Sequence, residues 1–130
     1  MKFSCQKDKL LNAVITTAKA AASKSTISAL EGLLFELSGN ILTITGYDLD
    51  IGIRTEIEVS GSEDGCTIAN AKLAEIIRKM PSGEISFFCD ASNTASIVNR
   101  ATEISVMCMS AEDYPNVPSV NPETSFTMPQ

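Results

Sequence analysis

The chain has 130 residues, of which 44% are hydrophobic and 20% are charged, and its formal net charge is −6. These values are typical of one globular domain with its own core. Histidine is absent, which excludes histidine-based acid–base catalysis and every histidine-containing metal site. No stretch approaches the roughly 20 apolar residues of a membrane-spanning helix, so we expect a cytoplasmic protein without membrane association.

The first long element predicted is a helix over residues 7–20, preceded by a short strand around Phe3. Apolar residues recur in this segment at helical spacing and share one face, which is expected to pack on the core. These residues are Leu10, Leu11, Val14, Ile15 and Ala18. The exposed surface of the helix is expected to carry charged, small polar or alanine side chains, namely Lys9, Asn12, Ala13, Thr16, Lys19 and Ala20.

The period of the apolar residues then changes to two, which indicates half-buried antiparallel strands. Leu33, Phe35 and Leu37 mark the first of them. The sequence Ser38-Gly39-Asn40 predicts a hairpin turn into a strand over residues 41–45. Gly46 and Tyr47 are expected to mark the next turn, and the alternation over residues 49–59 predicts a third strand.

The second half of the chain repeats this design. A helix is predicted over residues 71–80, with Asn70 as the candidate N-cap and Pro81 as the stop. Its inward positions are Leu73, Ile76, Ile77 and Met80. Strands are predicted over residues 84–89 and 94–99, separated by a turn at 90–93, and a last strand over 103–109.

The order strand, helix and three strands therefore occurs twice, over residues 1–60 and 65–110 approximately. Lys9-Leu10 of the first unit aligns with Lys72-Leu73 of the second. Such a repeat indicates an internal duplication. We predict an α+β fold in which two βαβββ units share one core and two helices pack on antiparallel sheet.

Charge is divided between the predicted helices and the predicted strands. Residues 7–24 contain four lysines and one aspartate, and residues 70–80 contain three basic residues and one glutamate, although the whole chain is acidic. One explanation is that these side chains are merely solvated. The same sign on both helices favours a second explanation, a polyanion facing the helix side. Such a surface contacts phosphates without reading base sequence.

Asp48 and Asp50 raise the alternative of a hard-cation site for nucleotidyl transfer or hydrolysis, with Glu112 and Asp113 as further ligands. No phosphate-binding glycine loop, convergent base or nucleophile accompanies them in the sequence. We therefore interpret the pair as part of an acidic strand layer, and we expect no metal, no cofactor and no catalytic residue.

The four cysteines are Cys5, Cys66, Cys89 and Cys108. They are widely spaced, form no CxxC pair and sit among apolar or strand-forming neighbours. A disulfide framework or a zinc site is the alternative to small buried side chains in a reducing cytosol, and the spacing favours the buried side chains.

Several segments, in order and along almost the whole chain, resemble the bacterial sliding clamp family, the β subunit of DNA polymerase III. They are Met1-Lys-Phe3, Lys9-Leu-Leu11, Lys24-Ser-Thr26, Leu30-Glu-Gly-Leu-Leu34, Leu42-Thr-Ile-Thr-Gly-Tyr-Asp-Leu49, Ala71-Lys-Leu73, Met80-Pro81 and Ala111-Glu-Asp-Tyr-Pro-Asn-Val117. Each segment is weak evidence by itself, but together they are specific.

The resemblance implies a DNA-clamp fold and a non-catalytic role as a processivity factor. Family members have three similar domains, and two subunits join head to tail in a ring around duplex DNA. Helices line the hole and sheets form the outer wall, so the ring slides while it tethers the polymerase. The family's association with polymerase and 3′–5′ exonuclease activity reflects the assembly that it serves.

The resemblance also implies site residues. Lys24 matches the family's DNA-contacting loop arginine. Where the family can carry two adjacent basic residues this chain has Ala71-Lys72, which puts a contact at Ala71 in doubt and leaves Lys72. The basic helices add Lys9, Lys19 and Lys79 as candidates for DNA contact. The last strand resembles the edge strand that joins a second subunit, with Ile104, Val106 and Lys72 at the expected interface.

We expect residues 1–118 to form the first clamp domain. Residues 119–130 are expected to be a linker and the first residues of a truncated second domain, so that the chain is a fragment. The pocket for polymerase and clamp-loader peptides lies in the family's later domains. The alternative to a clamp is an α+β protein-interaction module that uses its edge strand and does not bind DNA.

Overall fold

The structure is a computed structural model, and it describes residues 1–20, 31–48, 51–70, 73–81, 83–99 and 102–114. The elements of the first half are β1 (Lys2–Gln6), α1 (Lys7–Ala18), β2 (Gly32–Ser38), β3 (Ile41–Tyr47), β4 (Gly52–Glu58) and β5 (Ser60–Glu63). Those of the second half are β6 (Gly65–Asn70), α2 (Leu73–Arg78), β7 (Glu84–Cys89), β8 (Thr94–Asn99), β9 (Thr102–Met107) and the 3₁₀ turn η2 (Ala111–Asp113). The predicted order of elements is confirmed, with β5 as an additional short strand.

The strands form two antiparallel sheets, and each sheet takes strands from both halves of the chain. The five-stranded sheet has the order β5-β1-β7-β8-β9, and the four-stranded sheet has the order β4-β3-β2-β6. Phe3 of β1 is opposite Phe87 of β7, and Phe35 of β2 is opposite Thr67 of β6. Each βαβββ unit therefore gives its first strand to the sheet of the other unit, so the two units are interlocked.

The core lies between the sheets and the two helices. Phe87 stacks on Phe3 with ring centroids 5.1 Å apart and on Phe35 with centroids 5.7 Å apart. All three rings are fully buried. Because Phe3 and Phe87 belong to one sheet and Phe35 to the other, these contacts bind the two sheets together through aromatic burial.

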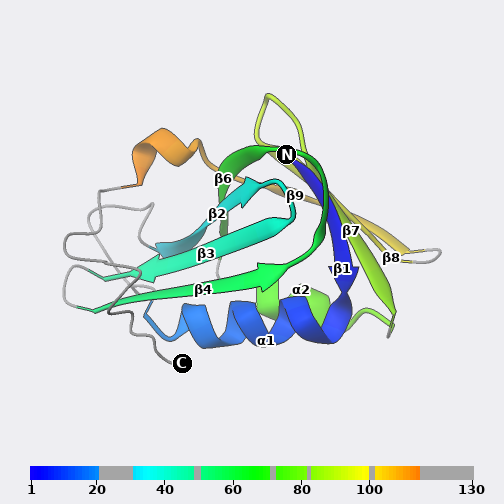
Figure 1. The fold of residues 1–130 in the computed structure, drawn as a ribbon, viewed down its shortest axis with the longest axis horizontal. Coiled ribbons are helices and arrows are strands. Elements are labelled where there is room, and N and C mark those ends of the chain that lie inside the picture. Colours follow the sequence, from blue (N-terminus) through cyan, green and yellow to red (C-terminus); the bar gives the residue numbers. More distant parts are fainter. Residues whose placement is uncertain (21–30, 49–50, 71–72, 82, 100–101, 115–130) are drawn as a thin grey trace.

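Both helices lie on the same side of the molecule, with α1 running along β2, β3 and β4 (Figure 1). The buried residues of α1 are Leu10, Ala13, Val14 and Thr17. The prediction that Ala13 and Ala20 are exposed is wrong, since both are buried. The Thr17 hydroxyl donates to the carbonyl oxygen of Ala13 at 2.8 Å and can accept from the Thr55 hydroxyl, whose Oγ1 is 3.0 Å away, which satisfies a polar group inside the core.

The turn between β3 and β4 lies later than predicted. Gly46 and Tyr47 are strand residues of β3. The chain reverses at Asp48 and Ile51, where the amide of Ile51 donates to Asp48 Oδ1 at 2.7 Å and the amide of Asp48 donates to the carbonyl of Ile51 at 3.2 Å. Ile51 is 59% exposed, although the alternation over residues 49–59 placed it on the buried face of this strand. The inward-facing residues of the strand therefore begin after Ile51.

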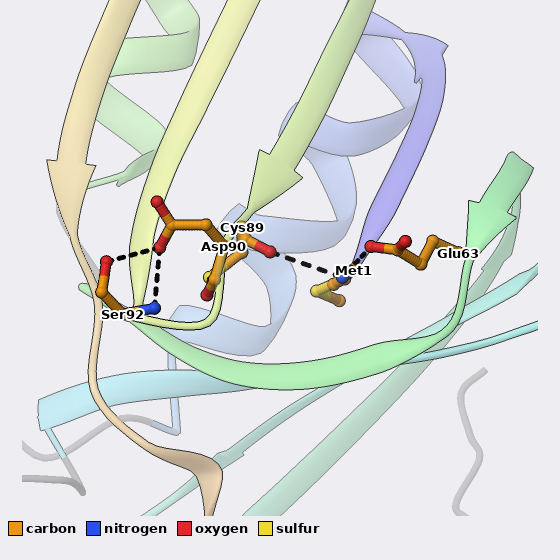
Figure 2. Close-up of polar contacts among 5 residues, drawn as sticks. All are labelled: Met1, Glu63, Cys89, Asp90 and Ser92. Atoms are coloured by element: carbon orange, nitrogen blue, oxygen red, sulfur yellow. Dashed lines mark hydrogen bonds and ion pairs between the residues drawn. The ribbon is translucent and has the colours of Figure 1, made fainter.

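The chain start is held at the junction of β1, β5 and β7 (Figure 2). The ammonium of Met1 donates to Glu63 Oε1 at 3.3 Å and to the carbonyl of Cys89 at 3.4 Å. In the turn that follows β7, the Asp90 carboxylate accepts from the amide and the hydroxyl of Ser92, at 2.9 and 2.7 Å. The hairpin turn predicted at residues 90–93 is confirmed.

After β9 the chain crosses to the outer face of the four-stranded sheet. Met109 and Ile68 exchange two backbone hydrogen bonds of 3.0 Å, and the Tyr114 hydroxyl donates to the carbonyl of Thr45 at 3.4 Å. Tyr47, Ile68 and Tyr114 form a second, smaller apolar cluster. This segment therefore closes one end of the four-stranded sheet.

Candidate nucleic-acid interface

The two helices contact each other, and Lys7 bonds the start of α1 to the end of α2. The ammonium of Lys7, the first residue of α1, donates to the carbonyl of Arg78 at 3.1 Å and to that of Met80 at 2.7 Å. Its backbone amide donates to the carbonyl of Gly83 at 2.8 Å. The start of α1 is thus bonded to the end of α2 and to the loop that follows.

Three of the five lysines predicted to contact DNA are placed by the structure. Lys9, Lys19 and Lys79 are all exposed, on α1 or directly after one of the helices. The ammonium of Lys9 donates to the carbonyl of Glu58 at the end of β4, at 3.0 Å. Lys24 and Lys72 lie outside the described residues, so their contacts with DNA stay predictions.

Arg78 is a further exposed basic residue at the end of α2, and it is not among the residues predicted from the sequence. It lies in the last turn of that helix. Arg78 and Lys79 are neighbours in sequence, and they directly follow the buried residue Ile77. The sequence signal was present in the basic character of residues 70–80, which already included Arg78.

Half of the exposed acidic residues in the described part of the chain lie on the strands, and most of the others lie in loops and turns. Those on the strands are Glu36 of β2, Glu56 and Glu58 of β4, Glu63 of β5, Glu84 of β7 and Glu103 of β9. The helices carry Asp8 and Glu75 among their basic residues. Among the described residues, the helix segments therefore carry more basic than acidic side chains, and the strands carry more acidic than basic ones.

The predicted subunit-interface strand, β9, lies at an edge of the five-stranded sheet. Ile104 and Val106 are partly buried against the main core, while Met107 on the opposite face is 74% exposed. A hollow of about 310 Å³ lies beside this edge, lined by Ala69, Asn70, Leu73, Ile76, Val106 and Met107. An edge strand presents backbone groups to which another strand can pair.

Asp48 serves the turn described above, in which its carboxylate accepts a backbone amide. Asp50 lies outside the described residues. Among the side chains that the structure places, no group of three acidic or cysteine residues is gathered as a metal ion would require. The geometry of Asp48 therefore favours a turn residue over a catalytic ligand.

The cysteines are free thiols in different surroundings. Cys5 and Cys89 are buried as predicted, Cys108 is half-buried, and Cys66 is exposed, so the prediction of a buried side chain is wrong for Cys66. Burial raises the pKa of Cys5 and of Cys108 to about 11. These two thiols are protonated at neutral pH, which makes them poor nucleophiles.

Residues 1–118 match the family model described as the N-terminal domain of the DNA polymerase III beta subunit. The chain is 27% identical to the beta sliding clamp of Bacillus subtilis over 138 residues, which cover 99% of the chain and 36% of that protein. It is 29% identical to the beta sliding clamp of Proteus mirabilis, and this match covers 100% of the chain and 36% of that protein. The chain thus spans about a third of the length of these relatives.

Solved structures of sliding clamps have a fold similar to that of this chain. The DNA polymerase sliding clamp of Bacillus subtilis superposes with a TM-score of 0.87 at 28% identity, over 91% of this chain and 33% of that one. The sliding clamp of Caulobacter crescentus superposes with a TM-score of 0.85 at 26% identity, over 92% of this chain and 33% of that one. In the part of the chain that is described, no helix is long and apolar enough to cross a membrane. The duplicated fold and the match over residues 1–118 place the chain in the family of DNA polymerase III beta subunit N-terminal domains.

Proposed function

We propose that this chain acts as the first domain of a DNA polymerase processivity clamp, a ring that encircles duplex DNA and slides along it in the cytoplasm. The observation that carries the proposal is the exposure of Lys9, Lys19 and Lys79 on the helix side. It is supported by the acidic residues on the strands and by membership of the clamp family.

Contact with DNA is electrostatic and independent of sequence in this proposal. Lysine ammonium groups act as point charges toward phosphates. Between them α1 exposes Asn12 and Thr16, which are short side chains without an aromatic ring for base stacking. Lys24 and Lys72 are proposed to add to this surface. Such contacts exchange easily from one phosphate to the next, so the protein slides instead of stopping at a site.

The other partners are proposed from the family. A second clamp subunit is proposed to add a strand at β9, with Ile104, Val106 and Lys72 at the contact. Polymerase and clamp loader are proposed to bind outside this domain. Residues 1–118 are proposed as the first clamp domain, and residues 119–130 as a linker and the start of the next one. The role is tethering, so no catalytic residue is assigned.

The proposal is tested by measuring binding of the 130-residue chain to a fluorescent duplex of arbitrary sequence at several salt concentrations. We expect weak binding, with a dissociation constant on the order of 10⁻⁴ to 10⁻⁶ M that rises steeply with salt. The double variant Lys19→Glu/Lys79→Glu is expected to lose this binding. Lys2→Glu is the control, because Lys2 is an exposed strand residue paired with Phe88 on the five-stranded sheet.

Equal losses from the helix and strand variants would contradict a DNA-facing helix side. Binding that is tight, insensitive to salt or dependent on sequence would contradict the clamp as well. The interaction module considered above expects no effect of either variant on function, and membership of the clamp family does not favour it.

A further inference from the structure

Lys7 is a basic residue on the helix side whose ammonium is already used within the protein. It is half-buried, and its Nζ donates to two carbonyl oxygens, those of Arg78 and Met80, at 3.1 and 2.7 Å. An ammonium has three donors, so two of them are used here. This geometry differs from that of Lys19 and Lys79, which are exposed.

The two acceptors lie where α2 needs partners. The last carbonyls of a helix have no donor within the helix and require one from outside. The helix α2 has six residues, and so short a helix depends on tertiary contacts for its stability. Lys7 donates to the carbonyl of Arg78, the last residue of α2, and to the carbonyl of Met80, which lies two residues further along the chain.

The loop that follows is held from the other side by Asn99. Its Nδ2 donates to the carbonyl of Pro81 at 3.0 Å and to that of Glu84 at 3.2 Å, and Asn99 is 1% exposed. Asn99 therefore fixes the loop to β8, whereas Lys7 fixes the end of α2 to α1. Without Lys7, the end of α2 keeps its attachment to the sheet but loses two hydrogen bonds to the neighbouring helix.

Arg78 and Lys79 lie within the segment that Lys7 holds. Arg78 provides one of the accepting carbonyls, and Lys79 lies between the two accepting residues, while both side chains are exposed. We propose that Lys7 is a positioning residue, which fixes Arg78 and Lys79 on the DNA-facing surface and does not itself contact phosphate. This inference rests on the proposed function.

The test is a double-mutant cycle on the 130-residue chain, read as affinity for a fluorescent duplex at low salt. Lys7→Met removes the donors and keeps an unbranched side chain. Measured alone, it is expected to lower affinity by at least about threefold. Combined with Arg78→Met/Lys79→Met, it is expected to cause less than about a twofold further loss, since the residues through which it acts are already neutral. Lys2→Met is the matched control and is expected to leave affinity unchanged.

The variant Lys7→Gln separates the effect of the hydrogen bonds of Lys7 from the effect of its charge. It also replaces Lys7→Met in the experiment if that variant does not fold. Glutamine keeps an amide donor without a charge, so it is expected to retain more affinity than Lys7→Met. All variants are compared at a temperature where circular dichroism shows them folded. A merely structural role leaves the affinity of folded protein unchanged and overturns the proposal.

Two further outcomes are informative. Equal losses from Lys7→Met in both backgrounds, with no recovery in Lys7→Gln, would show that Lys7 contacts phosphate itself and would overturn the inference alone. Absence of any duplex binding by the unmodified chain would overturn the proposed function, and the inference with it. The unmodified chain therefore distinguishes the two failures.

Discussion

Gly46 of β3 lies directly against the backbone of Thr17 in α1. A Cβ at position 46 would overlap the carbonyl oxygen of Thr17, and it would lie 3.3 Å from a methyl carbon of Leu33. The residue predicted to mark a turn is therefore a point of close approach between helix and sheet. Only glycine fits this contact without a shift of the helix.

Gly46→Ala is expected to destabilise the protein by about 1–3 kcal/mol, because the added methyl group must push α1 away from β3. The measurement is the midpoint of urea unfolding at constant m-value. Gly39→Asn is the control: Gly39 has a φ of 61°, a Cβ there would meet no atom within 4 Å, and asparagine tolerates that backbone. Similar midpoints for both variants would contradict the close contact.

Stability is expected to fall at high pH because of Tyr114. Burial raises its pKa to about 12 from the ordinary value of 10. Between these two values the unfolded chain loses the phenolic proton while the folded chain keeps it, so the free energy of unfolding decreases as pH rises. The total loss is on the order of 2 kcal/mol.

Tyr114→Phe should make the decrease above pH 10 smaller and remove it between about pH 11 and 12, where the thiols of Cys5 and Cys108 no longer contribute. The measurement is urea unfolding at intervals from pH 8 to pH 12. The interval between pH 9 and 10 is an internal control. There the buried thiols of Cys5 and Cys108, with pKa values of about 11, are expected to lower stability in both proteins alike. An unchanged slope above pH 10 in the variant would refute the assignment.

The four thiols are expected to react at very different rates with iodoacetamide at pH 8. Cys66 is exposed and should be alkylated first. A pKa of about 11 leaves Cys5 and Cys108 with roughly 100-fold less thiolate than an ordinary cysteine. Peptide mass spectrometry after a short exposure measures the order, and urea-unfolded protein is the control in which all four react. Early alkylation of Cys5 in the folded protein would contradict its burial.

Asp90 is expected to stabilise the turn after β7 only while it is ionised. The hydrogen bond from the Ser92 hydroxyl, followed by that from the Thr94 amide, lowers the pKa of Asp90 below its ordinary 3.8. Its contribution is therefore present above the ordinary value and is lost as pH falls through the lowered one. Carbon NMR titration of the carboxyl checks the direction, and Ser92→Ala should move the pKa back toward the ordinary value.

Local pattern predicted most elements because each of them has its own periodicity. Residues 84–87 and 94–97 alternate between polar and apolar side chains, and the structure places β7 and β8 there. The strand β5 was missed because Ser60-Gly-Ser-Glu63 contains no apolar residue to give a period. It forms through backbone pairing with β1, which is a tertiary effect that no local pattern reports.

The candidate site was predictable as a charged surface but not as a set of contacts. The count of basic residues identified the helices, and the structure shows Lys9, Lys19 and Lys79 exposed, with the Lys9 ammonium bonded to the carbonyl of Glu58. The sequence could not show that Lys7 is bound to the carbonyls of Arg78 and Met80, because these partners are more than seventy positions away. A lysine that looks like its neighbours in sequence has a different role in the fold.

The interlocking of the two βαβββ units has a consequence during synthesis. Within this domain β1 is made before the other strands, and its neighbour β7 is made about eighty residues later. Its other neighbour, β5, lies at the edge of the same sheet and gives it little cover. Chain closure over such separations is slow, so the nascent N-terminal strand stays open to a chaperone or to a second chain until the domain is nearly complete.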